Sequence, residues 1–211
     1  AARRILAYVK TFLSDPAGGY YAAQDCEALL ADGGVAEGAY YFSLPDEKRK
    51  ALGLPKTDRR FFADLNGRMI SAVLTAATSS PEDRAFALKS LDRYFSQGVK
   101  GGAVRHRLGG EFSGLLEDYT ALSDASLSAY EATREKRYLD RALALVKAAQ
   151  AHYLSESGPA FYDRLPMKEL PAGLDRVLSP ELNARALALQ QRFVRALPAA
   201  HPERKSMKER S

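Results

Sequence analysis

Apolar residues recur at the spacing of an α-helix over most of the chain. The clearest stripe consists of Met69, Ile70, Val73, Leu74 and Ala77. Residues three and four apart share one face of a helix, so this spacing is typical of an amphipathic helix. The pattern predicts helices over about 5–12 and 46–52, from 66 to a break at 79, from 81 to a glycine-rich stretch at 98, and over about 115–133, 137–153 and 180–197.

Capping residues and glycine-rich stretches mark where these helices begin and end. Ser80-Pro81 places a serine cap and a first-turn proline before two acidic residues, which is typical of a helix start. The stretch 98–114 is rich in glycine and carries a predicted short strand at 104–107. Residues 157–163 read as a loop or small hairpin. The long helices are therefore separated by connections that contain glycine and aromatic residues.

Two predicted helical hairpins resemble each other at an offset of 55 residues. The matching pairs are Ser71 with Ser126, Ala77 with Ala132, Thr78 with Thr133, Ala87 with Ala142 and Leu88 with Leu143. Weak similarity at such a spacing is typical of stacked helical hairpins. We predict an all-α protein in which helical hairpins form part of an (α/α)6-toroid-like array. Residues 1–197 are predicted to form this domain, and the basic, weakly apolar residues 198–211 a disordered tail.

Composition narrows the classes of function. The chain has 211 residues, 46% of them hydrophobic, and no apolar run approaches the roughly 20 residues that span a bilayer. The formal charge is +5, but charges of both signs alternate outside the tail, which argues against a nucleic-acid interface. The single cysteine, Cys26, excludes an internal disulfide. We expect a cytoplasmic protein that binds neither membrane nor nucleic acid.

The segment from Gly18 to Tyr41 gathers tyrosines, glycines and acids with no helical or strand period. Such segments carry binding and catalysis when a scaffold holds them. Within it Gly19-Tyr20, Gln24-Asp25-Cys26-Glu27 and Glu37-Gly38-Ala39-Tyr40-Tyr41 follow one another. Four further stretches continue the pattern: 56–59 with Asn66-Gly67-Arg68-Met69-Ile70, then Glu117-Asp118-Tyr119, then 130–133, and finally Asp175 with Ser179-Pro180 and Asn183.

In this order the five stretches resemble the spermatogenesis-associated protein 20 family over roughly residues 5–195. Members of that family join a thioredoxin-like domain to an α/α-toroid, and only the toroid portion has a counterpart here. The chain departs from the family at Cys26 and Glu27, which replace Ala and Asp, and at Leu65, which replaces Trp. A full ring of six hairpins needs a longer chain. The resemblance therefore implies a shortened or partial toroid and a thioredoxin-like partner domain.

Such toroids resemble those of six-hairpin glycosidases and N-acylglucosamine 2-epimerases, whose sites lie at the mouth of the ring. This implies a sugar ligand and a site built on carboxylates, because glycoside hydrolysis needs one carboxyl as acid and another as base or nucleophile. The candidate catalytic residues are Asp118, Asp25 and Glu37. Each also has a structural interpretation: a helix N-terminal acid for Asp118, an Asx-turn for Asp25 and a turn residue for Glu37.

The candidate substrate-binding residues are those that offer stacking rings, amides or charges in the same stretches. They are Tyr41, Asn66, Arg105, Glu117, Tyr119, Asp175 and Asn183. Asn66 is equally suited to cap a helix, and the tyrosines to pack beneath the loops. The three scattered histidines, among them His106, show no metal-ligand spacing, so we expect neither a metal nor a cofactor.

Two classes of function remain from the sequence. The first is a carbohydrate-processing or sugar-binding protein with a carboxylate-based site. The second is a non-catalytic scaffold associated with a thioredoxin-like domain, which the departures at Cys26, Glu27 and Leu65 favour. The two differ in geometry, because an enzyme needs its acidic groups to converge on one cavity.

Overall fold

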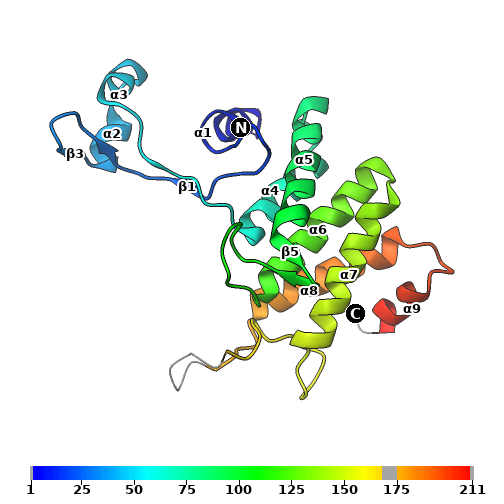
Figure 1. Cartoon of the computed structure of the whole chain (residues 1–211). Helices are drawn as coiled ribbons and strands as arrows, with labels where there is room; N and C mark the ends of the chain where they lie inside the picture. The colour runs from blue at the N-terminus through cyan, green and yellow to red at the C-terminus, as the bar shows by residue number, and fades with distance from the viewer. Residues whose placement is uncertain (1, 168–174, 210–211) are drawn as a thin grey trace.

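The computed structural model describes residues 2–167 and 175–209 (Figure 1). Its helices are α1 (Ala2–Phe12), α2 (Gly38–Ser43), α3 (Asp46–Leu52), α4 (Ala63–Thr75), α5 (Pro81–Gly98), α6 (Leu116–Thr133), α7 (Lys136–Tyr153), α8 (Pro180–Ala196) and α9 (Pro202–Glu209). Three antiparallel strand pairs connect some of them: β1 (Ala23–Gln24) with β4 (Thr57–Asp58), β2 (Ala28–Leu29) with β3 (Val35–Ala36), and β5 (Val99–Lys100) with β6 (Ala103–Val104).

The long helices form consecutive hairpins, α4–α5 and α6–α7, which confirms the predicted helical organisation. Helix α6 packs along α4 on one side and contacts α8 on another, while α5 and α7 pack against α4 and α6 respectively. The predicted boundaries are close to the observed ones. A difference occurs in α4, which begins at Ala63, three residues before Asn66, so Asn66 lies within the helix and is not its cap.

Small residues allow α4 and α6 to approach each other closely. A Cβ atom placed on Gly67 would lie 2.6 Å from the backbone carbonyl carbon of Ala121, so only glycine fits there. Farther along the same interface, Ser71 donates a hydrogen bond to Asp124 at 2.5 Å, and its hydroxyl lies 2.9 Å from that of Ser128. Residues of α4, α5, α6 and α7 such as Ile70, Leu91, Leu122 and Tyr138 form the main core around this contact.

Two asparagines, each in the first turn of its helix, fasten a preceding loop to that helix in the same way. Asn66 accepts a hydrogen bond from the backbone N–H of Tyr20 at 2.8 Å and donates to the carbonyl of Tyr20 at 3.0 Å. Asn183 of α8 accepts from the N–H of Phe161 at 2.6 Å and donates to its carbonyl at 2.9 Å. The repeated contact indicates that α4 and α8 occupy equivalent places in the array.

The N-terminal part contributes one helix to the body and a separate lobe. Helix α1 packs on the main core through Leu6 and Val9, and Lys10 forms a 2.7 Å ion pair with Asp83 of α5. Residues 23–58, which contain β1 to β4, α2 and α3, form the lobe, and Figure 1 shows α2 and α3 at one side of the helical body.

The C-terminal segment differs from the predicted disordered tail. Residues 202–209 form α9, which packs near α8. Met207 is buried in a second core cluster with Leu189, Phe193 and Leu197, and this apolar anchor was overlooked among the charged residues around it. Residues 210–211 of the predicted tail lie outside the described residues. Within the described part of the chain, no helix is both long and apolar enough to cross a lipid bilayer.

Candidate functional site

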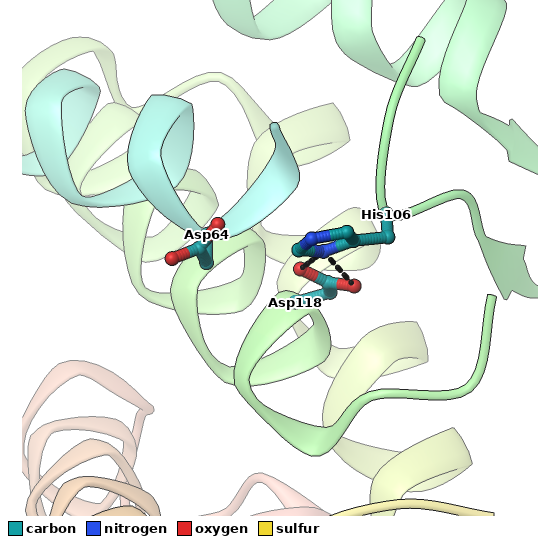
Figure 2. Close-up of side chains that lie close together, drawn as sticks. All are labelled: Asp64, His106 and Asp118. Carbon is teal, nitrogen blue, oxygen red and sulfur yellow. Dashed lines mark hydrogen bonds and ion pairs between the residues drawn. The ribbon is translucent and has the colours of Figure 1, made fainter. Parts of the chain in front are cut away.

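His106 and Asp118 form a hydrogen-bonded pair where the loop after β6 meets the start of α6. The Nδ1 atom of His106 lies 3.0 Å from Oδ1 and 3.1 Å from Oδ2 of Asp118 (Figure 2). The backbone of His106 is fixed on both sides: its N–H donates to the carbonyl of Phe112, and its carbonyl accepts from the N–H of Ala63, each at 2.9 Å. The loop thus holds the imidazole against the first turn of α6 and the start of α4.

The two partners differ in their access to solvent. Asp118 is wholly buried, whereas a quarter of the His106 side chain is exposed. Burial raises the pKa of Asp118 to about 7, although the hydrogen bond and the charge of His106 oppose this shift. The nearby carboxyl groups of Asp64 and Glu117 raise it further. Asp118 can therefore change its charge near neutral pH, and His106 is the member of the pair that a ligand can reach.

Asp64, in the first turn of α4, brings a second carboxyl group to the pair. Asp64, His106 and Asp118 each offer one ligand-type atom, and these three atoms lie within 4.8 Å of one another. Figure 2 shows the imidazole lying over the Asp118 carboxyl group, with Asp64 beside them. Carboxylate oxygens and a histidine nitrogen are suitable ligands for a divalent cation. The cluster is thus the group of described residues that could hold a metal ion, and the fold gathers it from positions that show no ligand spacing in the sequence.

Aromatic rings and a charged groove surround the pair. The rings of Phe62 and Phe112 lie 5.0 Å and 6.0 Å from the imidazole, and Phe112 is half-exposed. Arg68 of α4 connects the pair to the groove, because its guanidinium lies 3.2 Å from Glu117 and 3.7 Å from Asp64. Such a combination of stacking faces and charged hydrogen-bonding groups suits a polar ligand with an apolar face.

The groove consists of two adjoining cavities on α4, α6 and α8. Their volumes are about 220 Å³ and 370 Å³, and both are lined by Arg68, Glu117 and Arg185. Glu117 precedes Asp118 in the first turn of α6, so the groove begins next to the buried pair. The predicted binding residue Glu117 therefore lies at the site, paired with Arg68.

Arg105 lies beside His106 in the same loop but is engaged elsewhere. Its guanidinium donates to the carbonyl of Gly110 and forms a 3.0 Å ion pair with the exposed Glu111. These contacts stabilise the glycine-rich loop that carries His106.

The other two predicted catalytic acids are not brought to this pair. Asp25 and Glu37 are exposed residues of the lobe, and Figure 1 places that lobe away from the start of α6. Asp25 accepts a hydrogen bond from the N–H of Glu27 at 3.3 Å, which is the Asx-turn interpretation. Glu37 precedes α2 and makes no side-chain capping bond. The convergence of Asp25, Glu37 and Asp118 expected from the sequence is thus not observed.

The remaining predicted binding residues make contacts within the protein. Tyr119 is buried and donates to the carbonyl of Gly102, and Tyr41 is buried and donates to the carbonyl of Gly53. Asn66 and Asn183 fasten loops, as described above. Asp175 is exposed, and its carbonyl accepts a hydrogen bond from Arg164. Their hydrogen bonds explain these residues as parts of the scaffold.

Sequence reasoning missed Asp64, Arg68 and the partnership of His106 with Asp118. Asp64 stands two residues before the Asn66-Gly67 pair, and both Asp64 and Asp118 occupy first turns of helices that lie side by side. Acidic residues at two first turns were a signal that these helices present their N-termini at one end. The return of the loop to α4 through His106 had no sequence signal.

No protein-family model matches the chain, and no curated protein matches it in sequence. Solved structures of several toroid proteins are similar in fold. A sugar epimerase from a ruminal bacterium superposes with a TM-score of 0.62 and 18% identity over 98% of this chain and 50% of that one. Cellobiose 2-epimerase from Spirochaeta thermophila gives 0.59 and 11% over 99% and 52%. A family 76 glycoside hydrolase from a bovine Bacteroides thetaiotaomicron strain gives 0.58 and 15% over 99% and 54%.

These similarities establish the class of fold. The chain is an array of helical hairpins of the α/α-toroid type, as predicted, and it spans about half the length of the toroid proteins that it resembles. Identities below 20% carry no information on the reaction, because one fold supports many functions. The chemistry of the site has to be argued from His106, Asp118 and the groove beside them.

Proposed function

We propose that this chain is the toroid part of a carbohydrate-processing enzyme in which His106 transfers a proton and Asp118 positions it. The observation that carries this proposal is the hydrogen bond between the partly exposed imidazole and the wholly buried carboxyl group. A histidine held by a carboxylate is a common general base, because the carboxylate fixes the ring and its tautomer.

The charge of Asp118 decides which nitrogen of His106 carries the proton. An ionised carboxylate can only accept hydrogen bonds, so Nδ1 must donate to it and Nε2 is left with a free lone pair. Nε2 can then remove a proton from a bound substrate. When Asp118 is protonated it can donate to Nδ1 instead, which leaves the proton on Nε2. Since the pKa of Asp118 is about 7, the basic form of the pair becomes the main one as the pH rises above neutral.

The geometry favours proton transfer by histidine over hydrolysis by two carboxyl groups. Glycosidases place their two carboxyls roughly 5 to 10 Å apart, with both facing the bond that is cleaved. Ligand-type atoms of Asp64 and Asp118 lie within 4.8 Å, and Asp118 has no exposed surface. Removal of a proton beside a sugar carbonyl needs only one accessible base and a hydrogen-bonding group for the oxygen, and Arg68 lies next to the cluster for the second task.

The groove on α4, α6 and α8 supports a sugar as the ligand. Its two adjoining cavities together have the size of typical small-molecule pockets, which begin at about 300 Å³. Arg68, Glu117 and Thr120 offer donors and acceptors to hydroxyl groups, and Phe62 and Phe112 offer faces for a pyranose ring. The toroid proteins of similar fold include enzymes described as sugar epimerases, which agrees with this ligand class.

The test is exchange of a substrate hydrogen with solvent. The chain is incubated in D₂O with a panel of reducing monosaccharides and disaccharides, and NMR follows the loss of the proton next to the carbonyl carbon and the appearance of the epimer. We expect exchange with at least one sugar, a rise in its rate as the pH rises through about 7, and loss of exchange in His106→Gln. His152→Gln, at an exposed histidine of α7, is the matched control and should exchange normally.

Exchange that is unchanged in His106→Gln would contradict the proposed role of the histidine. Absence of exchange with every sugar, together with sugar-induced shifts of the melting temperature, would indicate a binding protein. Absence of both would favour the scaffold function. Circular dichroism of each variant shows whether it is folded before its exchange is compared.

We also propose that the chain belongs to a protein of the spermatogenesis-associated protein 20 type and associates with a thioredoxin-like domain. The ordered stretches 56–59 with 66–70, 117–119 and 179–183 support this proposal, and several of their residues have structural roles here, such as Gly67 at the α4–α6 contact. Binding of a thioredoxin-like domain to the chain, measured by size-exclusion chromatography of the mixture, is the expected result. Separate elution at micromolar concentrations would contradict it.

A further inference from the structure

A second cavity lies between α1 and the lobe, away from the His106 site. Its volume is about 290 Å³, and its walls are the rings of Tyr8 and Phe12 from α1 and Tyr41 and Phe42 from α2. Leu54 and Pro55, after α3, complete the apolar lining. The irregular segment that stands out in the sequence thus contributes to a cavity, although not to the one that holds Asp118.

The rim of this cavity exposes large apolar side chains. Tyr8 is 43% exposed, Phe42 is 53% exposed and Leu54 is 58% exposed. Scattered exposed apolar residues are normal, but a cluster of rings around a hollow is typical of a binding surface. The lining therefore favours a ligand with a flat apolar body.

Hydrogen bonds inside the protein already use the neutral polar groups of the cavity. Tyr41 donates to the carbonyl of Gly53 at 2.8 Å. Gln24 accepts a hydrogen bond from the hydroxyl of Tyr8 and donates to the carbonyl of Pro55. A sugar would need several neutral donors and acceptors for its hydroxyl groups, and this cavity offers few. Its ligand thus differs in class from the sugar proposed for the His106 site.

The polar groups with capacity for a ligand are cationic. Arg49 forms an ion pair with the exposed Asp46 and lies 5.8 Å from the centre of the Phe42 ring. Its Nε atom is buried and has no hydrogen-bond partner among the described residues. Lys50 forms a 3.1 Å ion pair with Glu47, in which both side chains are mostly exposed. Exposed ion pairs of this kind contribute little to stability, so an incoming anion can replace them easily.

We propose that this cavity binds a small carboxylate with an aromatic or flat apolar body. The body would stack between the rings of Tyr8 and Phe42, and the carboxylate would pair with the guanidinium of Arg49. Arginine binds carboxylates through two parallel hydrogen bonds, and pairing along its Nε edge satisfies the donor that the protein leaves unpaired. Lys50 adds a second positive charge at the same end. The charge of the lining, two cations against Asp46, is complementary to a single carboxylate.

The experiment is isothermal titration of the full chain with phenylpropanoate and with phenylpropanamide, its neutral counterpart. We expect saturable binding of the carboxylate with one molecule per chain, and binding of the amide that is weaker on the order of tenfold. Arg49→Met should weaken phenylpropanoate binding at least tenfold, because a hydrogen-bonded ion pair is lost. Lys48→Met is the matched control: it removes a charge from the same helix at an exposed position that does not line the cavity, and it should change binding little.

Three results would overturn the proposal: no binding of phenylpropanoate up to millimolar concentration, equal binding of acid and amide, or equal effects of Arg49→Met and Lys48→Met. Tyr8→Leu gives an independent check, because it removes a stacking ring from α1 without altering any charge, and it should weaken acid and amide alike. Thermal melting shows that each variant is folded. Neither ligand contains a sugar carbonyl, so these outcomes are independent of the exchange experiment at His106.

Discussion

The imidazole of His106 lies with Nδ1 3.0 Å and 3.1 Å from the two carboxylate oxygens of Asp118. The two residues belong to different elements, the loop after β6 and the first turn of α6, and only the histidine is exposed. An acid in this position cannot contact a substrate directly. It acts through the proton on Nδ1, so the charge of Asp118 should control the state of His106.

The first prediction concerns the tautomer of His106. Above pH 8 Asp118 is ionised and should hold the proton on Nδ1, whereas free histidine prefers the proton on Nε2. The ¹⁵N chemical shifts of the ring, measured by long-range ¹H–¹⁵N correlation, distinguish the two forms. We expect the Nδ1–H form for His106 in the wild type and its loss in Asp118→Ala, with His152 unchanged in both proteins. An Nε2–H form in the wild type at this pH would contradict the proposed positioning role.

The second prediction concerns stability and pH. The pKa of Asp118 is raised from 3.8 to about 7, mainly by burial, so between these values the folded state binds more protons than the unfolded state. Stability must therefore fall as the pH rises through this window, and the full cost, on the order of a few kcal/mol, is present above pH 7. Asp118→Asn removes the titrating group. It should be more stable than the wild type at pH 8, and this advantage should shrink toward pH 5.

Urea denaturation at several pH values measures this difference, and Asp163→Asn is the control. Asp163 lies at the groove but is partly exposed, so its substitution should give a pH-independent change. An advantage of Asp118→Asn that is constant between pH 5 and 8 would show that the carboxyl group does not titrate in this range.

The helices and their order could be predicted because each long helix carries its own signal. Ser80 and Asp83 form the expected capping box at the start of α5, and the apolar stripe of α4 faces the core. The small residues near Gly67 indicated close helix packing, and the structure shows the contact. These features depend on residues near one another in the chain, which is where sequence patterns are informative.

The site depends on contacts between distant residues and was predicted only in part. Asp118 and Glu117 were chosen because they open a helix after a glycine-rich loop, and both lie at the cluster. Asp25 and Glu37 were chosen for their composition, but the lobe that carries them turns away from α6. Asn66 and Asn183 looked like ligand-binding amides, yet both bind backbone groups of a loop. Sequence spacing did not reveal where those loops return.

The third prediction tests the role of the asparagine contact. Asn66 is buried, and its amide satisfies both the N–H and the carbonyl of Tyr20. Asn66→Ala leaves these two backbone groups without partners, which should cost about 2–4 kcal/mol of unfolding free energy. Asn183→Ala removes the same hydrogen bonds at a less buried position and should cost less. Chemical denaturation measures both. A loss below about 0.5 kcal/mol for Asn66→Ala would show that the contact is not needed to hold the loop.

The fourth prediction concerns Arg192, which fastens α8 to α6. Its guanidinium pairs with Asp124, contacts Ser128 at 3.1 Å and pairs with Glu131 at 2.6 Å, and less than a quarter of its side chain is exposed. Arg192→Met keeps the apolar stem but leaves the two acids without their cation, so a loss of about 1–3 kcal/mol is expected.

Arg185→Met provides the comparison for Arg192, because Arg185 lies one to two turns earlier on α8 and pairs only with Glu181 of its own helix at 2.6 Å, among the interactions described. An exposed pair four residues apart contributes about 0.3–0.5 kcal/mol, so this variant should be nearly as stable as the wild type. Hydrogen exchange should then show faster exchange of α8 in Arg192→Met than in Arg185→Met, because only the former loosens the helix from α6. Equal exchange in the two variants would mean that the apolar contacts of Leu189 and Phe193 alone hold α8 in place.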